Sequence, residues 1–239
     1  MEKKQTIIIL HGWGSAPQNW QKVAEELRKK NYQVEIPHLP GFDENYPIDK
    51  SYTLEDYSQW FIQFINQKKV NKPTIIGHSN GGRIAAYFAA KHQNKIEKLV
   101  LIGAAGIPPK NTLKRYLFKF LSKIGKAFFK ILNFDRLSLP AQKFLYKLSG
   151  ESDYLNASPI MKKTMINMLS SDLTKEFAKI KAQTLIIWGE DDTYTPFWMG
   201  EKIRQLIKNS QLVIIDNARH GIHLTHPEKL SQLIIKFIQ

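Results

Sequence analysis

The stretch Pro73-Thr-Ile-Ile-Gly-His-Ser-Asn-Gly-Gly-Arg83 decides the fold of this chain of 239 residues. A β-branched run leads into the pattern Gly-x-Ser-x-Gly, and the segment Arg83–Lys91 that follows has strong helix propensity. A serine between a strand and a helix occupies a very tight turn, and Gly77 and Gly81 remove the Cβ atoms that would clash there. The stretch therefore predicts a nucleophile elbow that holds the Ser79 hydroxyl above the edge of a sheet.

Short apolar strands alternate with helices on both sides of this elbow. The predicted strands are Thr6–Leu10, Tyr32–Ile36, Thr74–Gly77, Lys98–Ala104, Thr184–Trp188 and Leu212–Ile215. The predicted helices are Asn19–Lys30, Thr53–Gln67, Gly81–Lys91, Met199–Lys208 and Pro227–Phe237. This alternation predicts an α/β fold with a mostly parallel sheet covered by helices on both faces, and a site outside the carboxyl ends of the strands.

One long segment, Ile107–Ile180, breaks the alternation because it is helical by pattern and contains no clear strand. We interpret it as an insertion between two strands of the sheet. One stripe of its first part is basic and the opposite stripe is apolar. The basic stripe consists of Arg115, Lys119, Lys123, Lys126 and Lys130, and the apolar stripe of Leu117, Leu121, Ile124, Phe128 and Ile131.

The composition narrows the classes of protein that need to be considered. The chain has no cysteine, which excludes disulfides and thiol chemistry and is typical of a cytoplasmic protein. No apolar run is long enough to span a membrane. The net charge of +14 would suit nucleic acid, but no nucleic-acid-binding motif accompanies it, so we expect no such partner.

Two later strand ends supply the groups that a serine nucleophile needs, a base and an acid that orients the base. Three carboxylates, Glu190, Asp191 and Asp192, follow one predicted strand, and three histidines, His220, His223 and His226, follow the next. Residue types alone leave the choice within each group open, and the spacing of the histidines also invites a metal interpretation, which the intervening glycine and proline disfavour.

The first predicted strand ends in His11-Gly-Trp-Gly14, a glycine-flanked turn. The main-chain amides of Trp13 in this turn and of Asn80 in the elbow are the expected oxyanion donors. The candidate groups follow the order Ser, Asp, His along the chain, which is the order that this type of elbow uses.

In these motifs the chain resembles the α/β-hydrolase-fold serine hydrolases, over essentially its whole length. The resemblance implies a core domain of residues 1–106 and 181–239, interrupted by a helical cap of residues 107–180, and a trimmed fold without the two leading strands. It places the triad acid on Asp192 and the base on His220, although Arg219 stands where the family usually has a glycine. It implies a triad of Ser79, Asp192 and His220 that needs neither metal nor cofactor.

The expected activity is hydrolysis of small apolar acyl or aromatic carboxylic esters through an acyl-enzyme, as in carboxylesterases of this fold. The candidate pocket residues are His11, His78, Phe118 and Phe128. Two alternatives remain open: a carbon–carbon bond hydrolase of ring-fission products with the same triad, and a non-catalytic receptor that keeps the fold. The basic stripe is expected to be solvated, to dock an acidic carrier protein or to contact an anionic membrane surface.

Overall fold

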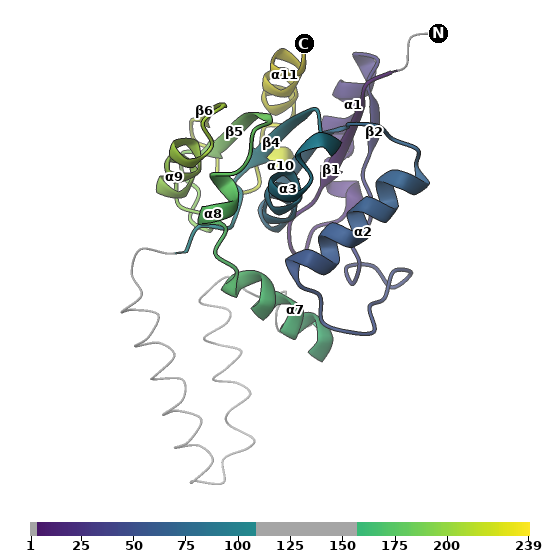
Figure 1. Ribbon diagram of the computed structural model, residues 1–239. Helices are drawn as coiled ribbons and strands as arrows, with labels where there is room; N and C mark the ends of the chain where they lie inside the picture. Colours follow the sequence, from purple (N-terminus) through teal and green to yellow (C-terminus); the bar gives the residue numbers. More distant parts are fainter. Residues whose placement is uncertain (1–3, 109–156) are drawn as a thin grey trace. The chain divides into compact units, whose positions relative to one another are not determined.

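The computed structural model describes residues 4–108 and 157–239 (Figure 1). The predicted basic stripe and the pocket candidates Phe118 and Phe128 lie outside the described residues. Residues up to Ile107 and from Lys163 to Gln239 belong to one compact unit, which contains the sheet. The extent of the expected cap, residues 107–180, stays a prediction.

The centre of this unit is a parallel sheet of six strands in the order β2-β1-β3-β4-β5-β6. The strands are β1 Thr6–Leu10, β2 Gln33–Glu35, β3 Thr74–His78, β4 Lys98–Ile102, β5 Gln183–Gly189 and β6 Ser210–Ile215. The predicted mostly parallel α/β architecture is confirmed. The order changes direction between β1 and β3, so their carboxyl ends form the switch point where sites of such sheets lie.

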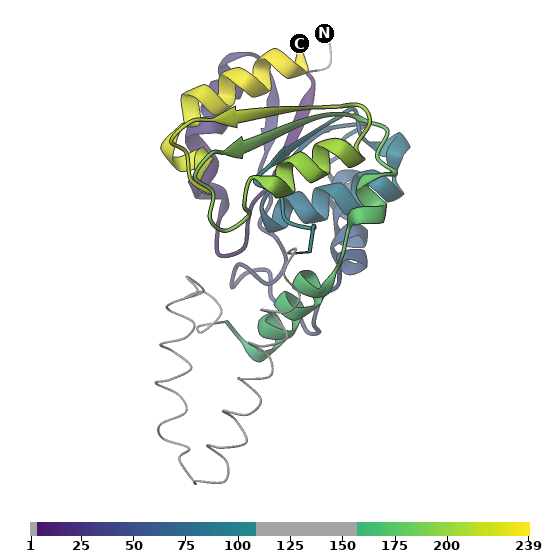
Figure 2. The ribbon, with the colours of Figure 1, turned by 90° about the vertical axis from the view of Figure 1, so that its left-hand side faces the viewer.

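Helices cover both faces of the sheet, because successive strand side chains point to opposite sides and both sets are apolar. Ile7 and Ile9 of β1 pack with α1 Gln21–Lys29 and α11 Pro227–Ile238 on one face. The other face, which includes Ile8, is covered by α2 Leu54–Gln67, α3 Asn80–Lys91, α8 Thr174–Phe177 and α9 Trp198–Leu206. Figures 1 and 2 show α11 on the opposite side of the sheet from α3 and α9.

Three of the remaining helices are short: η1 Pro17–Trp20, η2 Gln93–Lys95 and α10 Ile222–Thr225. The fourth, α7 Pro159–Ser170, lies within the expected insertion. The helix predicted over Asn19–Lys30 thus begins as a 3-10 turn. Thr53 caps α2 as expected, because its hydroxyl accepts from the Asp56 amide while the Asp56 carboxylate accepts from the Thr53 amide. In the part of the chain that the structure describes, no helix has the length and apolar character needed to cross a membrane.

The end of α7 and the residues after it join the core through polar contacts. The Thr164 hydroxyl accepts from the Tyr52 amide at 2.9 Å, and the Asn167 side chain donates to the Tyr52 carbonyl at 3.1 Å. Nη1 of the buried Arg83 in α3 donates to the main-chain carbonyls of Met168 and Ser171. Burial lowers the pKa of Arg83 to about 10.

The start of α3 lies directly against the end of β1. A Cβ atom on Gly81 would overlap the main-chain carbonyls of Leu10 and His11, and one on Gly77 would lie 2.6 Å from the Gly81 carbonyl oxygen. Real Cβ atoms do not approach other atoms as closely as this at either position. The contacting atoms belong to the main chain, which cannot move aside as a flexible side chain can. The helix therefore reaches this position only because the elbow carries glycines.

We expect Gly81→Ala to lower the free energy of unfolding by about 3 kcal/mol, the upper end for overpacking, although alanine otherwise favours a helix. The matched control is Gly221→Ala, because a Cβ there meets only a Leu224 methyl group at 3.8 Å. Urea unfolding measures both, with the control within about 0.5 kcal/mol of wild type. An unchanged or higher stability of Gly81→Ala would contradict the close approach.

Candidate active site

Ser79 stands in the turn between β3 and α3 with a main chain that few non-glycine residues adopt. Its φ is 51° and its ψ is −115°. Its amide donates to the Ile102 carbonyl at 3.0 Å, and its carbonyl accepts from the amides of Arg83 and Ala105, each at 3.1 Å. These hydrogen bonds hold the strained conformation and tie the serine to the end of β4. The predicted strand, turn and helix are therefore present.

Asp192 and His220 form a hydrogen-bonded pair at the ends of β5 and β6. The Asp192 Oδ2 atom lies 2.7 Å from Nδ1 of His220. The other oxygen, Oδ1, accepts from the amides of Tyr194 and Thr195, both at 2.9 Å. A carboxylate held by these donors accepts the Nδ1 proton of His220, which leaves Nε2 of the neutral ring free to take a proton.

The neighbouring candidates do not form this pair. Glu190 and Asp191 are exposed, and Glu190 accepts from the Asn217 amide at 3.3 Å. His223 is buried, and its ring stacks on Trp20 at 4.3 Å. His226 contacts the adjacent Thr225 hydroxyl at 2.8 Å. Within residues 4–108 and 157–239, no group of three or more His, Cys, Asp or Glu residues could hold a metal ion.

Gly103, directly after β4, lies against the pair. Its φ is +48°, and a Cβ there would lie 3.2 Å from both Asp192 Oδ2 and His220 Nδ1. The preceding carbonyl, of Ile102, accepts the Ser79 amide. The end of β4 thus binds Ser79 through Ile102 and lies against Asp192 and His220 through Gly103.

Thr195, which the sequence did not predict as a site residue, also contacts this pair. Its hydroxyl oxygen lies 2.8 Å from Asp192 Oδ2 and 3.3 Å from His220 Nδ1. A threonine three residues after an aspartate whose carboxylate accepts its amide is a recurrent turn pattern, and that spacing is the available signal. Thr195 thus adds a hydroxyl contact to the buried Asp192 carboxylate beside those from the two main-chain amides.

The turn after β1 lies beside Ser79. A Cβ on Gly12 would lie 3.2 Å from the Ser79 Cβ. His11 braces this turn: its Nε2 accepts from the Leu39 amide at 3.3 Å, so its Nδ1 carries the proton and donates to the Gly12 carbonyl at 2.9 Å. The main-chain amides of Trp13 and Asn80 donate to no carbonyl among the residues that the structure describes, so both are available to a ligand.

Two further histidines are buried behind His220. The ring centroid of His78 lies 4.7 Å from those of His220 and His223, and Trp20 covers the group. Burial lowers the pKa of His223 to about 4, and it lowers the pKa of His78 well below its ordinary value. The neighbouring histidines lower both pKa values further. Both rings are therefore neutral near pH 7.

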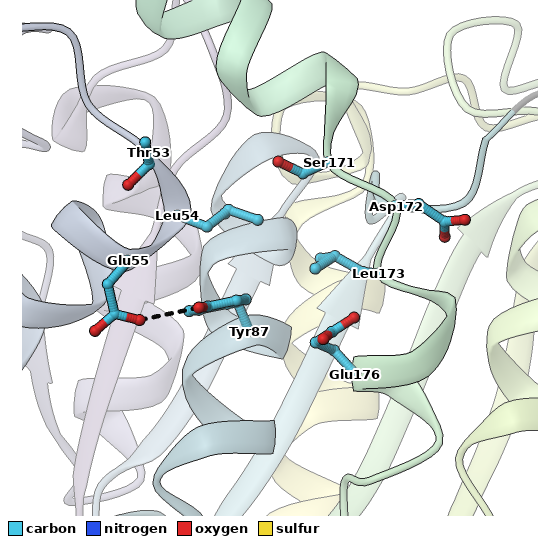
Figure 3. A pocket seen from close by; sticks show the side chains of 8 residues that line it. All are labelled: Thr53, Leu54, Glu55, Tyr87, Ser171, Asp172, Leu173 and Glu176. Carbon is cyan, nitrogen blue, oxygen red and sulfur yellow. Dashed lines mark hydrogen bonds between the residues drawn. The ribbon is translucent and has the colours of Figure 1, made fainter.

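A separate shallow pocket of about 250 Å³ lies over α2, α3 and the segment after α7 (Figure 3). It is lined by Thr53, Leu54, Glu55, Tyr87, Ser171, Asp172, Leu173 and Glu176. The Tyr87 hydroxyl donates to Glu55 at 2.9 Å. None of the residues around Ser79, Asp192 or His220 lines it, so it is not part of the candidate active site.

Comparison with known proteins identifies the class. The family model described as alpha/beta hydrolase fold matches residues 5–227, and the chain belongs to this family. It is 25% identical to 2-hydroxy-6-oxononadienedioate/2-hydroxy-6-oxononatrienedioate hydrolase 2 of Pseudomonas putida, over 100% of this chain and 89% of that protein.

Solved structures are similar over the whole chain. One is a membrane phospholipase A, which is 28% identical with a TM-score of 0.76, over 100% of this chain and 79% of that one. Another is a candidate lipase (lip1) from Acinetobacter baumannii AYE, which is 26% identical with a TM-score of 0.75, over 100% of this chain and 84% of that one. The relatives thus carry two kinds of hydrolase name within one fold.

The buried histidines predict an acid-sensitive fold. His223 is neutral in the folded chain down to pH about 4, whereas in the unfolded chain it takes up a proton below about 6.5. The free energy of unfolding should therefore fall as pH drops from 6.5 to 4. In His223→Phe, which keeps a ring against Trp20, the slope should decrease by about 1.4 kcal/mol per pH unit, as one proton requires. Urea unfolding measured across this pH range checks it, and parallel curves for the two proteins would contradict it.

Proposed function

We propose that this protein is a serine hydrolase that cleaves carboxylic esters of small apolar acyl or aromatic substrates through an acyl-enzyme intermediate. The observation that carries the proposal is the 2.7 Å contact of Asp192 with His220 beside Gly103, the residue after Ile102, whose carbonyl accepts the Ser79 amide. A serine hydroxyl alone is a weak nucleophile at neutral pH, and this arrangement supplies both the base and the group that orients it.

The reaction begins with the attack of Ser79 Oγ on the ester carbonyl carbon. Nε2 of His220 takes the hydroxyl proton as the Oγ–C bond forms, and Asp192 stabilises the resulting imidazolium through Nδ1. Collapse of the tetrahedral intermediate breaks the bond to the alcohol, which receives the proton from Nε2. Water then attacks the acyl-enzyme with His220 again as the base, and the acid leaves as Ser79 regains its proton.

The developing oxyanion needs donors that are already in place. We assign them to the main-chain amides of Trp13 and Asn80, which lie in the turn beside Ser79 and in the first residue of α3. Asn80 stands at a helix N-terminus, where free amides and the helix dipole favour negative charge. Donors of this kind typically contribute a factor of about 10² to 10³ to the rate.

Two similar structures support an ester substrate, because a phospholipase A and a lipase both hydrolyse ester bonds. The second candidate is a carbon–carbon bond hydrolase with the same triad, which the name of the Pseudomonas putida relative favours. A dioate substrate would need cationic partners for its carboxylates. Arg83 lies one helical turn after Ser79, but its Nη1 already donates to two main-chain carbonyls. We place the ester first on the strength of the two similar structures named above.

The first test is hydrolysis of p-nitrophenyl esters from acetate to laurate by the wild type and by Ser79→Ala. We expect turnover by the wild type and a loss of about 10³-fold or more in the variant, because the covalent route is removed. A burst of p-nitrophenol equal to the enzyme concentration would exclude a receptor without turnover. If no ester reacts but a vinylogous diketone of ring-fission type does, the second candidate replaces the first.

The second test compares two adjacent carboxylates. Asp192→Asn should lower kcat by about 10³- to 10⁴-fold, because the amide can no longer hold the Nδ1–H tautomer and stabilise the imidazolium of His220. Asp191→Asn should retain nearly full activity, because the Asp191 side chain is exposed. Equal effects of the two substitutions would contradict the assignment of the acid.

A further inference from the structure

His78, the last residue of β3, makes a contact that its place before Ser79 does not by itself require. Its Nε2 atom lies 3.0 Å from the main-chain carbonyl oxygen of His220, a residue far away in the sequence. The His78 side chain is only 4% exposed. The contact thus links the strand that carries the serine to the loop that carries the proposed base.

The partner fixes the tautomer of His78. A carbonyl oxygen only accepts, so Nε2 carries the proton and donates it, and Nδ1 holds the lone pair. Nδ1 has no hydrogen-bond partner among the described residues and lies 2.9 Å from where a Cβ of Gly12 would stand. Burial and the adjacent His220 and His223 keep the pKa of His78 low, so it adds no second positive charge when His220 takes a proton.

His220 therefore has two anchors. Asp192 holds Nδ1 of its ring, and His78 holds its main-chain carbonyl. A single contact on the ring leaves the ring free to swing about that contact, whereas a second on the main chain also fixes where Cα lies. The position of Nε2 relative to Ser79 depends on both.

We propose that His78 is a positioning residue that fixes the main chain of His220, so that Nε2 of the base lies in reach of the Ser79 hydroxyl. This inference rests on the proposed catalytic role of His220. It differs from the expected role of His78 as a wall of the substrate pocket. A wall acts through its shape and should be replaceable by another ring, whereas an anchor acts through its N–H.

Three substitutions separate the anchor from the wall. His78→Phe keeps a ring but has no donor. His78→Gln carries an N–H group four bonds from Cα, as Nε2 of histidine is. His78→Asn carries its N–H one bond closer to Cα, which leaves it short of the His220 carbonyl. Thermal unfolding of each variant shows whether it is folded under the assay conditions.

With p-nitrophenyl esters, we expect His78→Phe and His78→Asn to lower kcat by about 10- to 100-fold with KM changed less than about twofold. His78→Gln should recover most of that loss. The low-field ¹H NMR signal of the His220 Nδ1 proton should broaden in the Phe and Asn variants and remain sharp in the Gln variant. This signal requires no substrate turnover.

If His78→Phe retains wild-type kcat and a sharp Nδ1 signal, the anchor is wrong and His78 is a wall. The same holds if the Gln variant is no better than the Phe variant. These failures leave the proposed function intact as long as Ser79→Ala loses activity. If instead wild type and Ser79→Ala are equally inactive towards esters and diketones, the proposed function fails, and the NMR signals alone decide the contact between His78 and His220.

Discussion

The main chain of Ser79 is the constraint on which the rest of the site depends. A positive φ at a residue with a side chain costs about 1–3 kcal/mol, and it persists only where the surroundings over-determine it. Here Ile102, Arg83 and Ala105 supply three main-chain hydrogen bonds to one residue. The parallel pairing of β3 with β4 and the helix that begins at Asn80 offset this cost, so the conformation of Ser79 depends on the folded sheet and on α3.

Several polar side-chain groups are buried close to the candidate active site. The side chains of Trp20, His78 and His223 each contain a buried nitrogen without a hydrogen-bond partner among the described residues. Such groups lower stability, and apolar rings of the same shape would fill the space. Their presence is consistent with the proposed site, in which the neutral rings of His78 and His223 lie beside His220, the one ring that takes up a proton during the proposed reaction. The buried nitrogens thus lower the free energy of unfolding around the candidate active site.

The strands and the elbow were predictable because their signals are local. Apolar runs, a Gly-x-Ser-x-Gly turn and a capped helix at Thr53 each need only neighbouring residues. The start of α1 was harder to predict. The 3-10 turn over Pro17–Trp20 ends at Trp20, whose ring stacks on His223 near the other end of the chain. Propensity cannot anticipate such a partner.

The site was predictable as a set of motifs but not as a geometry. Residue types alone could not choose Asp192 from its neighbours, and the family pattern favoured it before any contact was known. The contact of His78 with the His220 carbonyl had no local signal, because the two residues are brought together only by the order of β3, β4, β5 and β6. Thr195 is intermediate, since its spacing from Asp192 is local and its approach to His220 is not.

The position of the insertion between β4 and β5 has a consequence for synthesis on the ribosome. The chain emerges from its N-terminus, so the strands around Ser79 leave the ribosome first, while β5 can pair with β4 only after the insertion has been made. Asp192 and then His220 follow, and α11 comes last to cover the apolar face of β1. A nascent chain, or one truncated before β5, therefore contains Ser79 without Asp192 and His220, and α11 is still absent when these two residues have been made.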